Sequence, residues 1–321
     1  MRKDLSRRDF LTTASSLATV ACTSSSSFAK GPAPGPRTLR LGGPIFLKSD
    51  DPAELAEEHR RLGYRAAYAP EVGINDANRI KAILKEFAAR DVALAEVGAW
   101  VNMLDPDPGK RRHNLSYVQE RLALAEMLGA RCCVDIAGSF NPSQWDGPDP
   151  GNITDEFIDA TVENCRHVID SVKPTRTRFS IEMMPFTFPT GPDDYLRLIR
   201  QVDRKGFAVH LDVCNVINSP DRMYRNNAVI EECFRKLGPW IVSCHAKDLD
   251  WKRYSQVCLL EVVPGRGKID YHAYLRGISR LAVDAPLMLE HLKAPEEYDE
   301  GRRYIQRVAR DMGLSFGPEG T

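Results

Sequence analysis

The chain has 321 residues, of which 43% are hydrophobic and 27% are charged, and these fractions are typical of a globular protein with a sizeable core. Lys and Arg together number 44, and so do Asp and Glu. The net charge therefore gives no reason to expect binding to nucleic acid or to an anionic membrane. The length alone fits one large domain or two ordinary ones.

The first 29 residues predict a twin-arginine export signal. Arg7 and Arg8 precede an apolar run at 10–21, which is too short and too rich in Ser and Thr to span a bilayer. The small-x-small pattern ending at Ala29 is typical of a cleavage site, whereas Cys22 offers an alternative site for lipid attachment. We expect a signal peptide at 1–29, a stiff linker at 30–37 and a periplasmic protein without a membrane span, with a lipid anchor on Cys22 as the alternative.

After the linker, short apolar runs alternate with amphipathic helical patterns. The predicted strands are 39–46, 65–69, 92–97, 131–137, 178–183, 207–212, 241–245 and 287–290. The predicted helices are 52–62, 75–90, 115–128, 155–172, 192–202, 228–237, 271–281 and 296–312. Eight strands alternating with eight helices predict parallel pairing with right-handed crossovers. We therefore expect a single (β/α)8 TIM barrel at 38–315, followed by a C-terminal tail at 316–321.

The longest predicted loops follow strands: 98–113, 138–153, 185–191, 213–225 and 247–268. In a barrel of this type these loops lie on the rim formed by the carboxyl ends of the strands, where the active site is found. The turns from helix to strand are short by comparison. The loop lengths thus indicate which rim carries the site.

Four side chains that can bind metal each close a predicted strand: Glu182 in RFSIEMMP, Asp212 in FAVHLDVCN, His245 in WIVSCHAKD and Glu290 in APLMLEHL. Strand ends converge on one rim, and three carboxylates with one imidazole suit a single divalent cation. A salt bridge is the alternative role for Glu182. Helix capping is the alternative for Asp212, but no helical pattern begins directly after it.

The segments IEMMP, HLDVCN, CHAKD, VPGRGKIDY and MLEHL occur in this order, and with them residues 38–313 resemble the xylose isomerase-like barrel superfamily, in particular its sugar phosphate isomerase/epimerase family. The resemblance implies one divalent cation on the four side chains above. Manganese is the expected ion, with magnesium, cobalt and zinc as alternatives. Two departures leave the substrate open. Asn215 replaces a His found in many relatives, and Phe188 replaces a second Glu found in tagatose-type epimerases.

A site of this kind can stabilise the enediolate that forms when a carbon beside a carbonyl loses its proton. Glu182 and Glu290 are the candidate catalytic base and acid. The first hypothesis is a metal-dependent sugar isomerase or epimerase, and the alternative is a lyase or hydratase that acts on a 3-keto-glycoside by β-elimination. A non-catalytic carbohydrate-binding barrel is a third hypothesis. The DNA-repair endonucleases of the superfamily need more histidine ligands than this rim offers.

Further candidates for contact with a carbohydrate lie at or near the predicted rim. Aromatic rings could stack on sugar faces, and the polar side chains could bind hydroxyl or carbonyl oxygens. Each has an ordinary alternative as a core, packing or solvated loop residue. The candidates are Trp100, Asn102, Trp145, Phe186, His210, Asn215, Lys247 and Arg266. The oligomeric state stays open.

Overall fold

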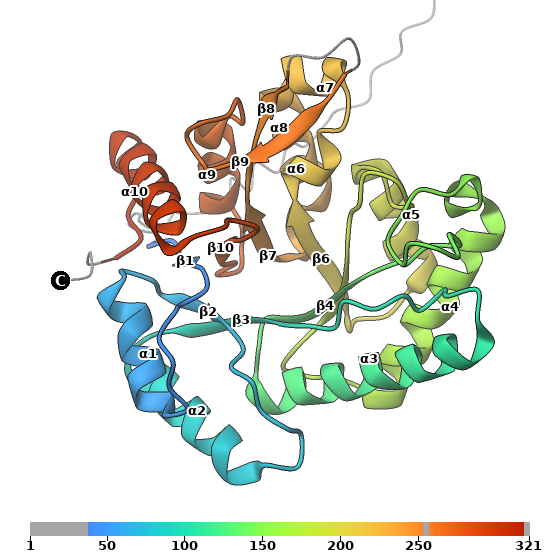
Figure 1. Cartoon of the computed structure of the whole chain (residues 1–321), viewed down its shortest axis with the longest axis horizontal. Helices are drawn as coiled ribbons and strands as arrows, with labels where there is room; N and C mark the ends of the chain where they lie inside the picture. Colours follow the sequence, from blue (N-terminus) through green and yellow to red (C-terminus); the bar gives the residue numbers. More distant parts are fainter. Residues whose placement is uncertain (1–37, 253–256, 318–321) are drawn as a thin grey trace, which may run out of the picture. The chain divides into compact units, whose positions relative to one another are not determined.

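The computed structural model describes residues 38–252 and 257–317, which belong to one compact unit. Its eight parallel strands close into a barrel in the order β1-β10-β7-β6-β5-β4-β3-β2, which confirms the predicted fold (Figure 1). The predicted signal peptide, the linker and the last four residues of the predicted tail lie outside the described residues. The barrel strands are β1 (Leu41–Gly42), β2 (Ala66–Tyr68), β3 (Ala93–Gly98), β4 (Cys132–Ile136), β5 (Phe179–Glu182), β6 (Phe207–Asp212), β7 (Ile241–Ala246) and β10 (Leu287–Leu289).

The principal helices follow the amphipathic patterns of the sequence and surround the strands (Figure 1). One predicted start is wrong, because α3 begins at Pro108 and not at 115. Asp107 caps this helix by accepting a hydrogen bond from the backbone N–H of Lys110, and proline fits the first helical turn. The principal helices are α1 (Pro52–Arg61), α2 (Ala77–Ala89), α3 (Pro108–Leu128), α4 (Asp155–Val172), α5 (Pro192–Val202), α8 (Asn226–Leu237), α9 (Tyr271–Ser279) and α10 (Pro295–Asp311).

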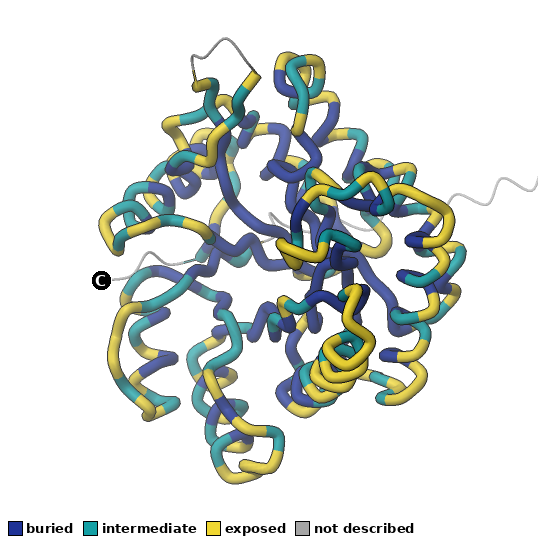
Figure 2. The backbone as a smooth tube through the Cα atoms, turned by 45° about the vertical axis from the view of Figure 1, so that its right-hand side comes forward, coloured by how far each residue is buried: buried dark blue, intermediate teal, exposed yellow. Residues whose placement is uncertain are grey.

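Burial explains why the barrel strands read as nearly continuous apolar runs. Every residue of β4, β5 and β6 is buried, because side chains on one face fill the barrel and those on the other face pack against helices. Figure 2 shows this buried centre inside a shell of exposed helix and loop surface. None of the helices in the described part of the chain is long and apolar enough to span a membrane.

The register of the strands determines which side chains lie next to one another at the carboxyl end of the barrel. Glu182 on β5 pairs with His210 on β6, and Asp212 pairs with His245 on β7. His245 in turn pairs with Met288 on β10, two residues before Glu290. Neighbouring strands of a sheet lie about 5 Å apart. The four predicted ligands are therefore carried to one side of the same barrel mouth.

The segment 247–268, predicted as a loop, contains an antiparallel ribbon of β8 (Asp248–Trp251) and β9 (Leu259–Val262). After the ribbon, the two glycines of VPGRGKID wrap around the Asp248 carboxylate, which accepts hydrogen bonds from the backbone N–H groups of Gly265 and Gly267. A side chain at Gly267 would lie 2.2 Å from Oδ1 of Asp248. Glycine is thus needed for this close approach.

Candidate metal centre

Glu182, Asp212, His245 and Glu290 meet at the carboxyl end of the barrel, and one donor atom from each lies within 4.8 Å of the others. Nδ1 of His245 is 3.2 Å from Oε1 of Glu182 and 2.8 Å from Oε1 of Glu290. His245 and Asp212 have no exposed surface. Three acidic groups held this close need a compensating cation, because burial removes the water that would otherwise screen them.

The two carboxylate oxygens of Asp212 have different roles. One of them caps a helix, which corrects the expectation that no helix begins directly after this residue. A four-residue helix, α6 (Val213–Val216), begins directly after it, and Oδ1 accepts a hydrogen bond from the N–H of Cys214 at 2.8 Å. So short a helix shows no periodic pattern, which is why the cap was not predicted. Oδ2 is not part of the cap and faces the other acids. Capping and ion binding are therefore compatible at this residue.

Lys247 contributes a cation of the protein itself to this cluster. Its Nζ lies 2.7 Å from Oδ2 of Asp212 and 2.6 Å from Oε1 of Glu290, and 3.5 Å from Oε1 of Glu261. The side chain is 3% exposed, so it is not a solvated loop lysine. Burial favours a lower pKa, but the surrounding carboxylates outweigh it and raise the pKa of Lys247 well above its usual value.

The two candidate catalytic acids differ in their electrostatic surroundings. Burial raises the pKa of Glu182, and the opposing attraction of His245 does not cancel that effect. Glu290 is also buried, but His245 and Lys247 together hold its pKa well below the usual value. Asn215 adds a hydrogen bond from Nδ2 to Oε1 of Glu182 at 3.1 Å. The residue that departs from the family pattern thus contacts a predicted ligand directly.

Glu96 on β3 belongs to this centre and was missed in the sequence. Oε2 of Glu96 lies 2.7 Å from Nε2 of His210, and Oε1 lies 3.0 Å from Nε2 of His245. The hydroxyl of Ser243 also donates to Oε2, at 3.3 Å. Burial acts to raise the pKa of Glu96, but the two histidines outweigh it and lower the pKa to about 2. A lone acid inside the apolar run VALAEVG was the available signal.

The chemistry of the donor set fits a divalent cation. Asp212 Oδ2 and Glu290 Oε1 are buried and accept no hydrogen bond of normal geometry, although the Lys247 ammonium lies within ion-pair distance of both. Carboxylate oxygens and one imidazole nitrogen suit manganese, magnesium, cobalt or zinc. The four predicted residues would hold such an ion.

A cavity of about 570 Å³ opens above this centre. Glu182 and Glu290 line this cavity, together with five of the residues predicted to contact a carbohydrate: Trp100, Trp145, Phe186, Asn215 and Lys247. The backbone of Trp100 has φ +45°, and its indole packs so closely on Gly98 that a side chain there would lie 2.1 Å from Nε1. Strained backbone of this kind is concentrated at functional sites.

The other three candidates lie elsewhere. Oδ1 of Asn102 accepts hydrogen bonds from the N–H groups of Leu104 and Ser139, so this buried side chain joins two rim loops. His210 lies below the cavity and is bound to Glu96. Arg266 points its guanidinium toward Glu300, with Nε 2.8 Å from Oε1, beside the main cavity. None of these three side chains lines the main cavity.

Two further rim residues, Glu261 and His291, contribute to the cavity wall. Glu261 on β9 lies 2.9 Å from Nδ1 of His291, through its Oε2, and both side chains line the cavity. His291 follows the predicted ligand Glu290 and has a positive φ of 58°. The pair was not predicted, because Glu261 belongs to the ribbon that the sequence pattern did not reveal.

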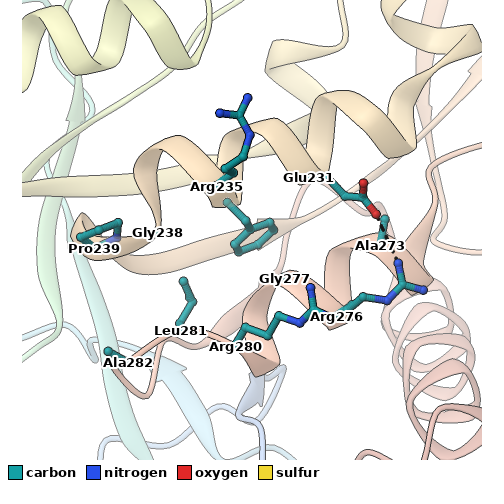
Figure 3. A pocket seen from close by; sticks show the side chains of 11 residues that line it. Glu231, Arg235, Gly238, Pro239, Ala273, Arg276, Gly277, Arg280, Leu281 and Ala282 are labelled. Atoms are coloured by element: carbon teal, nitrogen blue, oxygen red, sulfur yellow. Dashed lines mark hydrogen bonds and ion pairs between the residues drawn. The ribbon is translucent and has the colours of Figure 1, made fainter. Parts of the chain in front are cut away.

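A second cavity of about 640 Å³ lies on the outer surface between α8 and α9 (Figure 3). Phe234, Leu281 and Pro239 form its apolar part, and Arg276 reaches Glu231 across its edge, at 3.3 Å. None of the metal-competent groups found among the described residues lies there. The metal-competent groups of the described residues therefore lie at the barrel and not at this outer cavity.

The comparisons with known proteins agree with this architecture. A family model described as a xylose isomerase-like TIM barrel matches residues 53–308. None of the curated proteins matches the chain.

Three solved structures illustrate the range of similar folds. A xylose isomerase-like TIM barrel protein from Mycobacterium smegmatis, in complex with magnesium, is 20% identical over 81% of this chain and 88% of that chain, with a TM-score of 0.59. Endonuclease IV from Thermus thermophilus is 15% identical over 85% and 99%, with a TM-score of 0.64. The 3-keto-D-glucoside 4-epimerase from E. coli is 13% identical over 84% and 99%, with a TM-score of 0.60. At such identities the similarity establishes the fold alone.

Proposed function

The chain belongs to the xylose isomerase-like TIM barrel family, and we propose that it is a divalent-metal-dependent carbohydrate isomerase or epimerase. The observation that carries the proposal is the cluster of three carboxylates and one imidazole, within 4.8 Å of one another, at the floor of a cavity lined by aromatic side chains. Members of one fold family differ in their chemistry, so the assignment rests on the site and not on the fold.

In the proposed mechanism Glu182, Asp212, His245 and Glu290 would hold the cation, with manganese as the expected ion. When bound, the cation supplies Lewis-acid stabilisation of negative charge that develops on the substrate oxygens. Glu182 and Glu290 remove and return the proton on the carbon beside the carbonyl. Lys247 places its ammonium beside both Asp212 and Glu290, where it can also stabilise a substrate oxygen. Proton return to the same carbon gives an epimer, and return to the next carbon gives an isomer.

The charges of the cavity favour an uncharged carbohydrate over a sugar phosphate. Among the described residues that line the cavity, the cationic candidates are Lys247 and His291, and each already lies against carboxylates. The acids Asp146, Glu182, Glu261 and Glu290 line the same cavity. One divalent cation would offset two negative charges and leave no excess positive charge for a phosphate. The same balance argues against a nucleic-acid substrate.

Aromatic side chains supply the complementary contact surface. Trp100, Trp145 and Phe186 are 40%, 43% and 53% exposed at the cavity. Large rings that stay accessible at a cavity mouth can stack on the apolar faces of a sugar ring. They provide binding that needs no charge on the substrate.

Elimination from a 3-keto-glycoside is the second candidate. The charge balance of the cavity suits an uncharged, oxidised glycoside, the kind of compound named in the description of one protein of similar fold, a 3-keto-D-glucoside 4-epimerase. Loss of the proton beside the 3-keto group creates the same kind of carbanion in both reactions. Expulsion of the aglycone from the neighbouring carbon then gives a lyase, whereas return of the proton gives an epimer.

The experiment that tests these proposals is incubation of the manganese-loaded protein in deuterium oxide with D-fructose, D-fructose 6-phosphate and 3-ketoglucosides. An isomer or epimer carrying deuterium supports the first proposal, and it should form faster from the unphosphorylated sugar. Release of the aglycone instead supports the lyase. Binding without exchange or product would overturn both and leave a non-catalytic barrel.

Variants and metal removal make the test specific. Glu182→Gln and Glu290→Gln should each abolish turnover with little change in melting temperature, because Gln keeps the shape but cannot take up the proton. Glu71→Gln, at an exposed rim position, is the matched control and should stay active. Chelation should stop turnover, and added Mn²⁺ should restore it. Near-normal activity of both active-site variants would refute the mechanism.

A further inference from the structure

We propose that Glu96 is a positioning residue that holds His210 and His245 in the Nε2–H tautomer, so that Nδ1 of His245 presents its lone pair to the metal site. The inference rests on the proposed metal-dependent function and assigns a role to a residue outside the four predicted ligands. Glu96 lies on the far side of His245 from those ligands. It is therefore placed to set the orientation of the imidazole without binding the ion itself.

The geometry around Glu96 fixes the direction of each hydrogen bond. Its two oxygens lie 2.7 Å from Nε2 of His210 and 3.0 Å from Nε2 of His245. The hydroxyl of Ser243 lies 3.3 Å from Oε2. An ionised carboxylate has acceptors only, and so both imidazoles must donate from Nε2.

The opposite edge of His245 is then determined. With the Nε2 proton held by Glu96, Nδ1 is the nitrogen left to bind an ion. Without an ion, Nδ1 carries a proton that the neighbouring carboxylates accept. Nδ1 lies 3.2 Å from Oε1 of Glu182 and 2.8 Å from Oε1 of Glu290, among the donor atoms of the candidate metal centre. A carboxylate behind a ligating histidine is a common way to orient the ring and to increase its basicity.

His210 completes the arrangement by holding the carboxylate in turn. Its ring lies 4.0 Å from the ring of His245, centroid to centroid, with an interplanar angle of 69°. Both histidines are fully buried, and Glu96 is 2% exposed. The carboxylate is therefore shared between two rings that pack edge to face, and neither ring can turn without losing its bond to Glu96. His210 thus belongs to the support of the site and not to the cavity wall.

The test is the substitution Glu96→Gln, with Ser243→Ala as the matched control. Gln has one acceptor oxygen and one NH₂ group. It can therefore accept a hydrogen bond from the Nε2–H of only one histidine, and its NH₂ group faces the Nε2 of the other. Two measurements are made. Titration calorimetry gives the affinity for Mn²⁺, and ¹⁵N NMR of histidine-labelled, metal-free protein shows which ring nitrogens carry a proton.

We expect Glu96→Gln to weaken Mn²⁺ binding about 10- to 100-fold and to move at least one buried histidine to the Nδ1–H tautomer. Ser243→Ala removes only the longest contact to the carboxylate and should leave both readouts near wild type. If Glu96→Gln does not fold, Glu96→Asp keeps the charge but withdraws the carboxylate from the rings. That variant should also weaken Mn²⁺ binding and alter the tautomers.

Three results would overturn the inference. One is wild-type affinity together with wild-type tautomers in the Gln variant, or in the Asp variant if that is the one that folds. Another is weaker Mn²⁺ binding with unchanged tautomers, because the carboxylate would then act only through its charge. The third is an Nε2 without a proton on His245 in the wild-type protein. If wild-type protein binds no Mn²⁺, the proposed function fails, whereas the NMR measurement still tests Glu96 separately.

Discussion

Replacement of Lys247 by Met tests whether an ammonium and a metal ion compensate the same buried acids. Met is close to Lys in length and shape but carries no charge. Lys247 is 3% exposed and contacts oxygens of Asp212 and Glu290. We expect the variant to be destabilised strongly without metal and much less with saturating Mn²⁺, because the ion brings positive charge to the same oxygens.

The size of the effect follows from the distances. At 2.6 and 2.7 Å, each contact is worth about 6 kcal/mol of Coulomb attraction at an effective dielectric constant of about 20. Desolvation of the ammonium offsets much of this attraction. Removal of one partner from a buried ion pair costs about 3–5 kcal/mol in the free energy of unfolding. For a domain of this size, that loss lowers the melting temperature by about 6–10 °C.

The assay is thermal unfolding of chelated and Mn²⁺-saturated protein, followed by circular dichroism. The matched control is Lys48→Met, which neutralises an exposed lysine and should change neither melting temperature by more than about 2 °C. The rise in melting temperature on adding Mn²⁺ should be at least twice as large in Lys247→Met as in wild type. An equal loss of stability with and without Mn²⁺ would refute the reasoning.

Two other predictions concern the interior and the rim. Burial raises the pKa of Asp135 well above 3.8, so the folded state keeps a proton that the unfolded state releases, and this contribution to stability falls by up to about 1.4 kcal/mol per pH unit above pH 4. Asp135→Asn has no such proton to lose. Between pH 5 and pH 8, the free energy of unfolding measured with urea should therefore fall less in the variant than in the wild-type protein. An equal fall in both proteins would contradict this prediction. Trp100→Gly should raise KM for the proposed sugar substrate about fivefold, because the contact with the indole ring is lost. The melting temperature should not fall, because glycine accepts the positive φ of this position. An unchanged KM would show that the indole does not contribute to substrate binding.

Much of the fold follows from patterns that the sequence displays directly. Each barrel strand is a short apolar run, and α4 and α5 have the predicted bounds because an amphipathic pattern and a clear cap or proline coincide at their starts. The four predicted ligands meet because each closes a strand, and closure of the barrel brings strand ends together. Those features depend on local residues and on a general rule of topology.

Other features depend on contacts that the sequence does not display. Glu96 lies within its strand and not at the end. It was therefore not identified by the rule that identified Glu182, which considered metal-binding residues at strand ends. A buried acid is costly at either position. The partners that make Glu96 tolerable, His210 and His245, lie 114 and 149 residues away. Asn102 is a rim residue by position, but its hydrogen bonds to another loop become visible only when the two loops are folded together.

The ribbon of β8 and β9 supplies Glu261 to the cavity while it pairs only with itself among the described strands. It leaves the barrel after β7 and the chain returns at α9, so its length and sequence can vary without shifting the register of any barrel strand. Changes in this segment could therefore alter the cavity wall without altering the barrel. The candidate metal centre on the barrel strands and this part of the cavity wall thus belong to separate segments of the chain.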